Sequence, residues 1–163
     1  MAGCIKTRAS KRVGATTLSH LLKDEALRLA EGEEWFFCGD PSCDVVYFST
    51  DGRTLPRSAL KVSVGLKERT SPRTLCYCFG YTFEDVERDA TRAECSVAQA
   101  IGEKCRQGLD RCDETNPHGK CCLGDVRAVF KDAVARSSRK PRSEDEAGTS
   151  GGCCGAKPGE GLS

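Results

Sequence analysis

The cysteines of this chain stand in tight groups, and one group is the Cys-Tyr-Cys triplet at residues 76–78. A disulfide between two such close thiols would be strained, whereas a cation that binds both thiolates removes their mutual repulsion. Farther on, Cys112 precedes the adjacent pair Cys121 and Cys122. The Cα atoms of neighbouring residues lie about 3.8 Å apart, closer than a disulfide prefers. The two groups therefore favour metal over a cross-link, and four thiolates suit either Zn²⁺ or a [2Fe–2S] cluster.

A further pair, Cys38 and Cys43, stands at the two ends of a turn sequence. Aromatic and β-branched residues before and after the turn predict strands at 34–38 and 43–49 that form a hairpin. A Cys-x₄-Cys loop of this kind binds zinc as half of a tetrahedral site. The alternative is a disulfide across the hairpin, which a reducing compartment disfavours.

Composition limits the class of protein. The chain has 163 residues, of which 38% are hydrophobic and 6% aromatic. We therefore expect one domain with a small core that needs a bound metal or a disulfide to stabilise it. A net charge of +1 argues against nucleic acid or an anionic membrane as the main partner. The sequence contains neither a run of 18 apolar residues nor the apolar stretch of a secretory signal at its start. We therefore expect a cytoplasmic protein without membrane insertion, whose cysteines are reduced.

The elements that must position these cysteines follow from periodicity and capping signals. Helical spacing of apolar residues predicts a helix over roughly 18–30, with His20 on its surface, and alternation predicts a third strand at 60–65. Capping boxes at Thr82 and Ser96 predict two helices, the first to about residue 90 and the second ending near Gly108. A last amphipathic helix is predicted at 124–134, with its first turn directed at the Cys-Cys pair.

Three regions differ in composition. Residues 1–12 form a basic arm that contains Cys4, residues 13–135 form the folded domain, and residues 136–163 form a polar tail that we expect to be disordered. The tail carries the vicinal pair Cys153-Cys154, which either captures a soft ion such as Cu(I) or has no role. Cys95 and Cys105 are expected to act as small buried hydrophobes in the helical region.

Three blocks of sequence together carry a resemblance to a family: Cys-Tyr-Cys-Phe-Gly-Tyr-Thr at 76–82, Asn-Pro-x-Gly-x-Cys-Cys-Leu-Gly at 116–124, and Cys-Asp-Val-Val-Tyr-Phe at 43–48. Residues 13–135 resemble the amino-terminal domain of CopZ-type iron–sulfur metallochaperones, and the cluster half is similar to bacterioferritin-associated ferredoxin modules. The resemblance implies an α+β fold: a small antiparallel sheet or hairpin with a zinc-type cysteine loop, and a helical [2Fe–2S]-binding module.

The resemblance also implies a ligand set. The cluster ligands would be Cys76, Cys78, Cys112 and one of Cys121 or Cys122, of which we prefer Cys122. The zinc half-site would be Cys38 and Cys43. Family members open with a Cys-x-x-Cys knuckle where this sequence has Cys4 alone, so either Cys4 is a third zinc ligand or the site is degraded. After residue 135 the chain has Cys153-Cys154 where longer members have a copper-carrying domain with a Met-x-Cys-x-x-Cys loop.

The function implied is that of a metallochaperone-like one-electron carrier, not an enzyme, in the handling of copper or another soft metal. Its partners would be redox or metal-handling proteins, such as a metal-transporting ATPase system, and not nucleic acid. The alternative is a non-redox structural zinc protein that acts as an interaction module. A thiol enzyme is disfavoured because neither histidine is placed as a base, and His118 as an iron ligand is the lesser possibility beside two adjacent cysteines.

Overall fold

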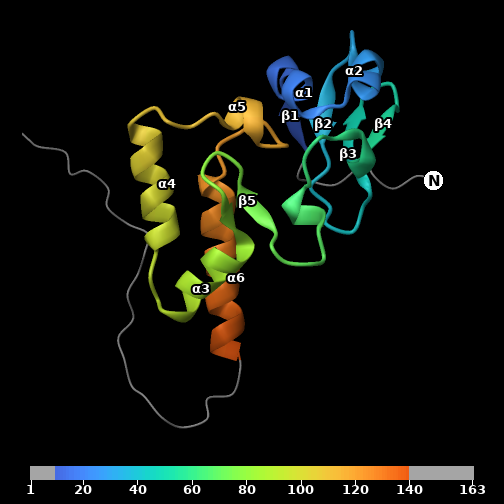
Figure 1. Ribbon diagram of the computed structural model, residues 1–163. Coiled ribbons are helices and arrows are strands. Elements are labelled where there is room, and N and C mark those ends of the chain that lie inside the picture. Colours follow the sequence, from blue (N-terminus) through green and yellow to red (C-terminus); the bar gives the residue numbers. More distant parts are fainter. Residues whose placement is uncertain (1–9, 140–163) are drawn as a thin grey trace, which may run out of the picture.

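The computed structural model describes residues 10–139 and has an α+β fold with two halves, each with its own apolar core (Figure 1). The α+β prediction is confirmed. Cys4, most of the basic arm and the tail with Cys153-Cys154 lie outside the described residues. Among the described helices, none is long and apolar enough to cross a membrane.

The first half is an antiparallel four-stranded sheet with the strand order β1-β2-β3-β4. Its elements are β1 Lys11–Val13, α1 Ala15–Leu21, α2 Asp24–Ala30, β2 Trp35–Phe37, β3 Val45–Ser49 and β4 Thr54–Pro56. The predicted hairpin is present as β2 and β3, in which Phe36 pairs with Phe48. The buried residues of these elements, among them Leu22, Trp35 and Tyr47, form the first core.

The single helix predicted over 18–30 is wrong, because the chain forms α1 and α2 with a break at Leu22. Leu22 has extended backbone angles and bridges to Leu60, while the Lys23 N–H donates to the Ala59 carbonyl. At the break, Leu22 lies in an extended segment and is fully buried in the core. Leu29 of α2 is 60% exposed.

The strand predicted at 60–65 is also wrong. The fourth strand is β4, and the chain continues through two 3₁₀ turns, η2 Arg57–Ala59 and η3 Gly65–Lys67. Leu60 and Val64 are buried as separate anchors in the first core rather than as members of a ladder. The alternation of apolar and polar residues arises because Leu60 and Val64 are each buried in an irregular segment. Periodicity alone does not distinguish such a segment from a strand.

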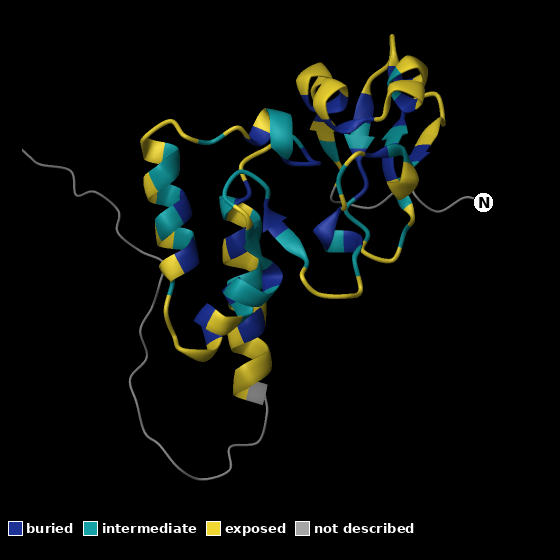
Figure 2. Cartoon of the chain, viewed as in Figure 1, coloured by how far each residue is buried: buried dark blue, intermediate teal, exposed yellow. Residues whose placement is uncertain are grey.

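The second half is helical around one short hairpin. It contains β5 Thr74–Cys76, β6 Tyr81–Thr82, α3 Phe83–Thr91, α4 Ser96–Arg106, α5 Cys112–Thr115 and α6 Leu123–Arg139. Its core joins α3, α4 and α6 through Val86, Ile101 and Val126. Figure 2 shows buried, intermediate and exposed residues together on the helices of this half, with a run of exposed residues at the end of α6.

The two capping predictions have different outcomes. At Thr82 the box is confirmed, since the Asp85 N–H donates to the Thr82 hydroxyl and the Thr82 N–H donates to the Asp85 carboxylate. The box at Ser96 is wrong, because Cys95 is the N-cap of α4. Instead, the buried Asp89 of α3 accepts hydrogen bonds from the Ser96 hydroxyl at 2.6 Å and the Val97 N–H at 2.7 Å. A carboxylate from a neighbouring helix thus replaces the local cap.

The ends of α4 and α6 and the start of the folded region can be compared with the predicted limits. Gly108 follows α4 with a φ of 70°, as expected for a helix stop. The last helix is confirmed and is longer than expected, since α6 continues past residue 135 to Arg139. Lys11 and Arg12, placed in the basic arm, lie in β1. The division into arm, domain and tail stays a prediction.

Polar contacts join the two halves. The buried Tyr47 hydroxyl of β3 donates to the Pro117 carbonyl at 2.7 Å, and the Thr17 hydroxyl of α1 donates to the Asp113 carbonyl at 2.6 Å. Both acceptors lie in the segment that carries Cys112. The sheet half therefore supports the loop that supplies the late cysteines.

Candidate metal centre

Sulfur atoms from two distant segments meet in the helical half. Cys76 ends β5 and Cys78 lies in the turn after it, while Cys112 begins α5 and Cys122 directly precedes α6. The Cys78 and Cys112 sulfur atoms lie 3.4 Å apart. The Cys76 and Cys122 thiols share a hydrogen bond. The structure thus brings the early and late cysteine groups together.

Two contacts link the four sulfur atoms across the two segments. One pair is Cys76 with Cys122 and the other is Cys78 with Cys112. In the part of the chain that the structure describes, no three Cys, His, Asp or Glu side chains converge as a single ion would require.

The structure distinguishes the two adjacent late cysteines. Cys122 is 1% exposed and packs in the second core, whereas Cys121 is exposed. Cys122 is also the residue whose thiol contacts Cys76. The geometry therefore favours Cys122 over Cys121 as the fourth sulfur of this group.

Cys105 lies closer to the sulfur atoms than its isolated position in the sequence suggested. It is half-buried, packs against the second core and contacts Cys121. Burial, then the neighbouring Cys121, raises the pKa of Cys105 to about 11. The signal was present in the helical spacing, because Val97, Ile101 and Cys105 repeat every four residues on one face of α4.

Hydrogen bonds and burial give the thiols different pKa values. The Cys122 thiol and the backbone N–H groups of Phe79 and Cys78 donate to the Cys76 sulfur and, against the effect of burial, lower its pKa to about 7. Donation to Cys76, followed by burial, raises the pKa of Cys122. Burial, then the contact with Cys78, raises the pKa of Cys112. The group therefore favours one thiolate at Cys76, and a bound cation would replace the other protons.

Further donors surround the Cys78 sulfur. The Arg111 N–H donates to it at 3.3 Å, and the Thr115 hydroxyl lies 3.2 Å away. Cys122 lies at the start of α6, where the Val126 N–H donates to its carbonyl, and the helix dipole places partial positive charge at this end. Such groups stabilise anionic sulfur.

The zinc-type loop lies at the end of the sheet. Cys38 is fully buried directly after β2, and Cys43 is half-buried before β3. The Cys38 N–H donates to the Val46 carbonyl at 2.8 Å, and the Asp40 carboxylate accepts from the Ser42 N–H at 2.8 Å, which closes the turn. Cys4, the third predicted zinc ligand, lies outside the described residues.

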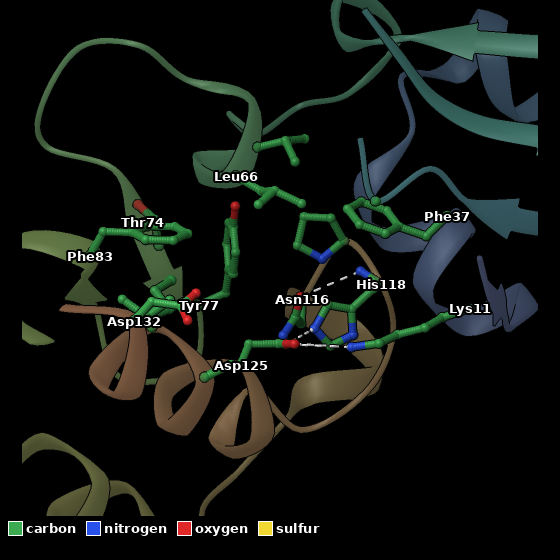
Figure 3. A pocket seen from close by; sticks show the side chains of 16 residues that line it. Lys11, Phe37, Leu66, Thr74, Tyr77, Phe83, Asn116, His118, Asp125 and Asp132 are labelled. Atoms are coloured by element: carbon green, nitrogen blue, oxygen red, sulfur yellow. Dashed lines mark hydrogen bonds and ion pairs between the residues drawn. The ribbon is translucent and has the colours of Figure 1, made fainter. Parts of the chain in front are cut away.

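His118 does not act with the sulfur atoms. It is 8% exposed, its Nε2 lies 2.6 Å from the Asp125 carboxylate, and its Nδ1 accepts from the Lys120 N–H. Lys11 reaches the same carboxylate at 3.2 Å (Figure 3). With both ring nitrogens engaged, His118 supports the junction between the two halves, and the structure gives no support to its role as an iron ligand. His20 is exposed, as predicted.

A cavity of about 260 Å³ lies at this junction (Figure 3). Apolar side chains dominate its wall, and His118 and Asp125 line one side. Tyr77, the middle residue of the Cys-Tyr-Cys triplet, lines this cavity, and its side chain extends toward Leu66 (Figure 3). The triplet therefore contributes to both the thiol group and the junction.

A cysteine hairpin on a small sheet and a thiol-lined helical module define a cysteine-rich metal-binding domain. Comparison with known families makes this assignment specific. Residues 4–61 match the family zf_CopZ, which is described as a zinc binding domain.

The chain is also similar to one curated protein and to one solved structure. It is 33% identical over 93 residues to the copper chaperone CopZ of Archaeoglobus fulgidus, an alignment that covers 55% of this chain and 42% of the relative. The chain thus spans less than half the length of that relative. The X-ray structure of the Archaeoglobus fulgidus CopZ N-terminal domain matches with a TM-score of 0.63 and 27% identity, over 78% of this chain and 95% of that one. The predicted resemblance to CopZ-type amino-terminal domains is confirmed.

Proposed function

We propose that this chain carries a [2Fe–2S] cluster as well as zinc, and that it passes single electrons in the handling of copper or another soft metal. The cluster ligands are Cys76, Cys78, Cys112 and Cys122, and zinc is held by Cys38 and Cys43 with Cys4 as a third ligand. The name of its relative, a copper chaperone, supports the connection to copper.

The observation that carries the proposal is the pairing of the sulfur atoms. Each iron of a [2Fe–2S] cluster takes two thiolates, so the centre needs two sulfur pairs, whereas one zinc ion takes four ligands around a single point. Cys78 and Cys112 form one pair at 3.4 Å, and Cys76 and Cys122 form the other. A two-plus-two arrangement fits the dinuclear cluster better than a mononuclear ion.

The cluster, when bound, supplies a centre that accepts and releases one electron. The chain provides the surroundings that control this chemistry. Buried Cys76 and Cys122 exclude water from one side, and N–H groups of Phe79 and Arg111 donate to ligand sulfurs. Such donors stabilise the more negative state and raise the reduction potential.

The partners we propose are redox or metal-handling proteins, such as those of a metal-transporting ATPase system. The chain acts in this proposal as a carrier and not as an enzyme. Its histidines agree with that role, because His118 is held by Asp125 and the Lys120 N–H and His20 is exposed.

A second candidate is a structural zinc protein that acts as an interaction module. The family match favours it, since residues 4–61 match a family described as a zinc binding domain. In that case the four cysteines of the helical half would close a second zinc site, and the protein would be colourless.

Anaerobic purification of the full chain tests the two candidates. We expect a red-brown protein with iron and inorganic sulfide in equal amounts, together with zinc, and a paramagnetic signal after one-electron reduction. A colourless protein that contains zinc and no iron would contradict the cluster and support the interaction module.

A further inference from the structure

The Tyr77 hydroxyl connects the cysteine triplet to a segment of the sheet half. It accepts a hydrogen bond from the Gly65 N–H at 2.9 Å and donates one to the Ser63 carbonyl at 3.0 Å. Tyr77 thus holds the start of η3 from a position between Cys76 and Cys78.

A close backbone contact holds the same turn against β5. A Cβ atom placed on Gly65 would lie 1.9 Å from the Thr74 carbonyl oxygen. Only glycine allows this approach. Because β5 runs from Thr74 to Cys76, η3 packs directly on the strand that delivers the first cluster sulfur.

Lys67, at the end of η3, connects to the zinc-type loop. Its side chain is buried, with the residue 3% exposed, and Nζ donates to the Asp40 carbonyl at 2.7 Å and the Cys43 carbonyl at 3.1 Å. The same Nζ lies 6.0 Å from the centre of the Phe37 ring. A buried ammonium is costly unless negative groups compensate it, and metal-bound thiolates in this loop would do so.

These contacts form one continuous path between the two cysteine sites. It runs from the Cys76–Cys78 turn through the Tyr77 hydroxyl to η3, and from Lys67 to the backbone of Cys43. We propose that residues 63–67 couple the two sites, so that metal bound at the Cys38/Cys43 loop orders the Cys76–Cys78 turn and strengthens metal binding there. Lys67 and Tyr77 are positioning residues in this coupling, which rests on the proposed function in that both sites bind metal.

Thermodynamic linkage makes the coupling reciprocal. If zinc at the loop raises the metal affinity of the turn, then metal at the turn must raise zinc affinity by the same factor. A substitution on the path should therefore change the properties of the site that it does not touch. That effect separates coupling from a purely local structural role.

The first test replaces Lys67. In Lys67→Met the Asp40 and Cys43 carbonyls lose their donor, and we expect zinc affinity to fall about 10-fold or more, as for other residues that support metal ligands. Zinc transfer from the full chain to a chromogenic chelator measures this affinity. Lys61→Met is the matched control, because Lys61 is an exposed lysine between η2 and η3, and it should leave zinc affinity unchanged.

The second test replaces Tyr77 and reads the distant loop. Tyr77→Phe removes both hydroxyl hydrogen bonds and keeps the ring, so we expect faster zinc release from the Cys38/Cys43 loop. Tyr81→Phe, in the same hairpin, is its control. In iron-free protein kept anaerobic, zinc is expected to slow alkylation of Cys76 and Cys78 by iodoacetamide, measured by mass spectrometry, and Lys67→Met is expected to abolish that protection.

The coupling is supported if Tyr77→Phe weakens zinc binding and Lys67→Met removes the protection of Cys76 and Cys78. It is overturned if Tyr77→Phe leaves zinc affinity unchanged, or if alkylation is independent of zinc. Should Lys67→Met fail to fold, the Tyr77→Phe result decides. Neither measurement needs iron. If the purified protein contains no iron, the proposed cluster is contradicted, but the two measurements still test the coupling.

Discussion

The Cys78 and Cys112 sulfur atoms lie 3.4 Å apart, although 34 positions separate the residues in the chain. Cys78 lies in a turn after β5, and Cys112 begins α5 on a segment that the sheet half holds through Thr17. The contact therefore depends on both halves of the fold. It also places two thiols where one metal atom could bind them together.

Cys76→Ser and Cys78→Ser should each abolish the visible absorption of the anaerobic protein and loosen the helical half, because each removes one sulfur from a different pair. Absorption spectroscopy and urea unfolding of the purified variants measure the two effects. Retention of full colour in both variants would defeat the ligand assignment.

Cys121 and Cys122 should behave differently despite being adjacent. Cys122→Ser removes a buried sulfur that contacts Cys76 and should eliminate iron binding, whereas Cys121→Ser changes an exposed residue and should retain it. Iron and sulfide analysis of the two variants provides the comparison. Equal loss in both, or the reverse order, would contradict the assignment of Cys122.

Asp89 should stabilise the fold by capping α4. Its carboxylate accepts from the Ser96 hydroxyl and the Val97 N–H, so Asp89→Ala should lower the free energy of unfolding by about 1–3 kcal/mol. Glu94→Gln changes an exposed residue between α3 and α4 and serves as the control for urea unfolding. Equal stability of the Asp89 and Glu94 variants would show that α4 does not need this cap.

Glu84 should make stability depend on pH in the acid range. Although burial alone would raise its pKa, hydrogen bonds from the Arg73 side chain, the Arg73 N–H and Ser71 lower it from 4.5 to about 2. A carboxylate with a lowered pKa in the folded state contributes stability that is complete above pH 4.5 and is lost as pH falls toward 2. Unfolding measured across this window should be less pH-dependent in Glu84→Gln, and an unchanged slope would argue against the interaction.

Removal of the tail should leave metal binding unchanged. The sequence predicted a boundary at residue 135, but Arg136 of α6 forms an ion pair with Glu87 of α3 at 3.1 Å, so the cut belongs after residue 139. A chain of residues 1–139 should keep the colour and metal content of the full chain. Loss of iron on truncation would show that the tail contributes to the site.

Local patterns in the sequence were enough for several elements. The turn between Cys38 and Cys43, the box at Thr82 and the apolar face of the last helix depend on neighbouring residues, so they could be predicted and are present. The break at Leu22 and the cap on α4 could not be predicted, because their partners, Leu60 and Asp89, are distant in the chain or belong to another element.

The sequence by itself determined which cysteines stand close together along the chain, because thiol spacing is a covalent property. Only the tertiary structure decided that Cys122 rather than Cys121 faces Cys76, and that Lys67 lies against the zinc-type loop. These outcomes depend on the direction of side chains once α6 and η3 have packed. Packing is set by contacts between segments far apart in sequence, and no local spacing specifies it.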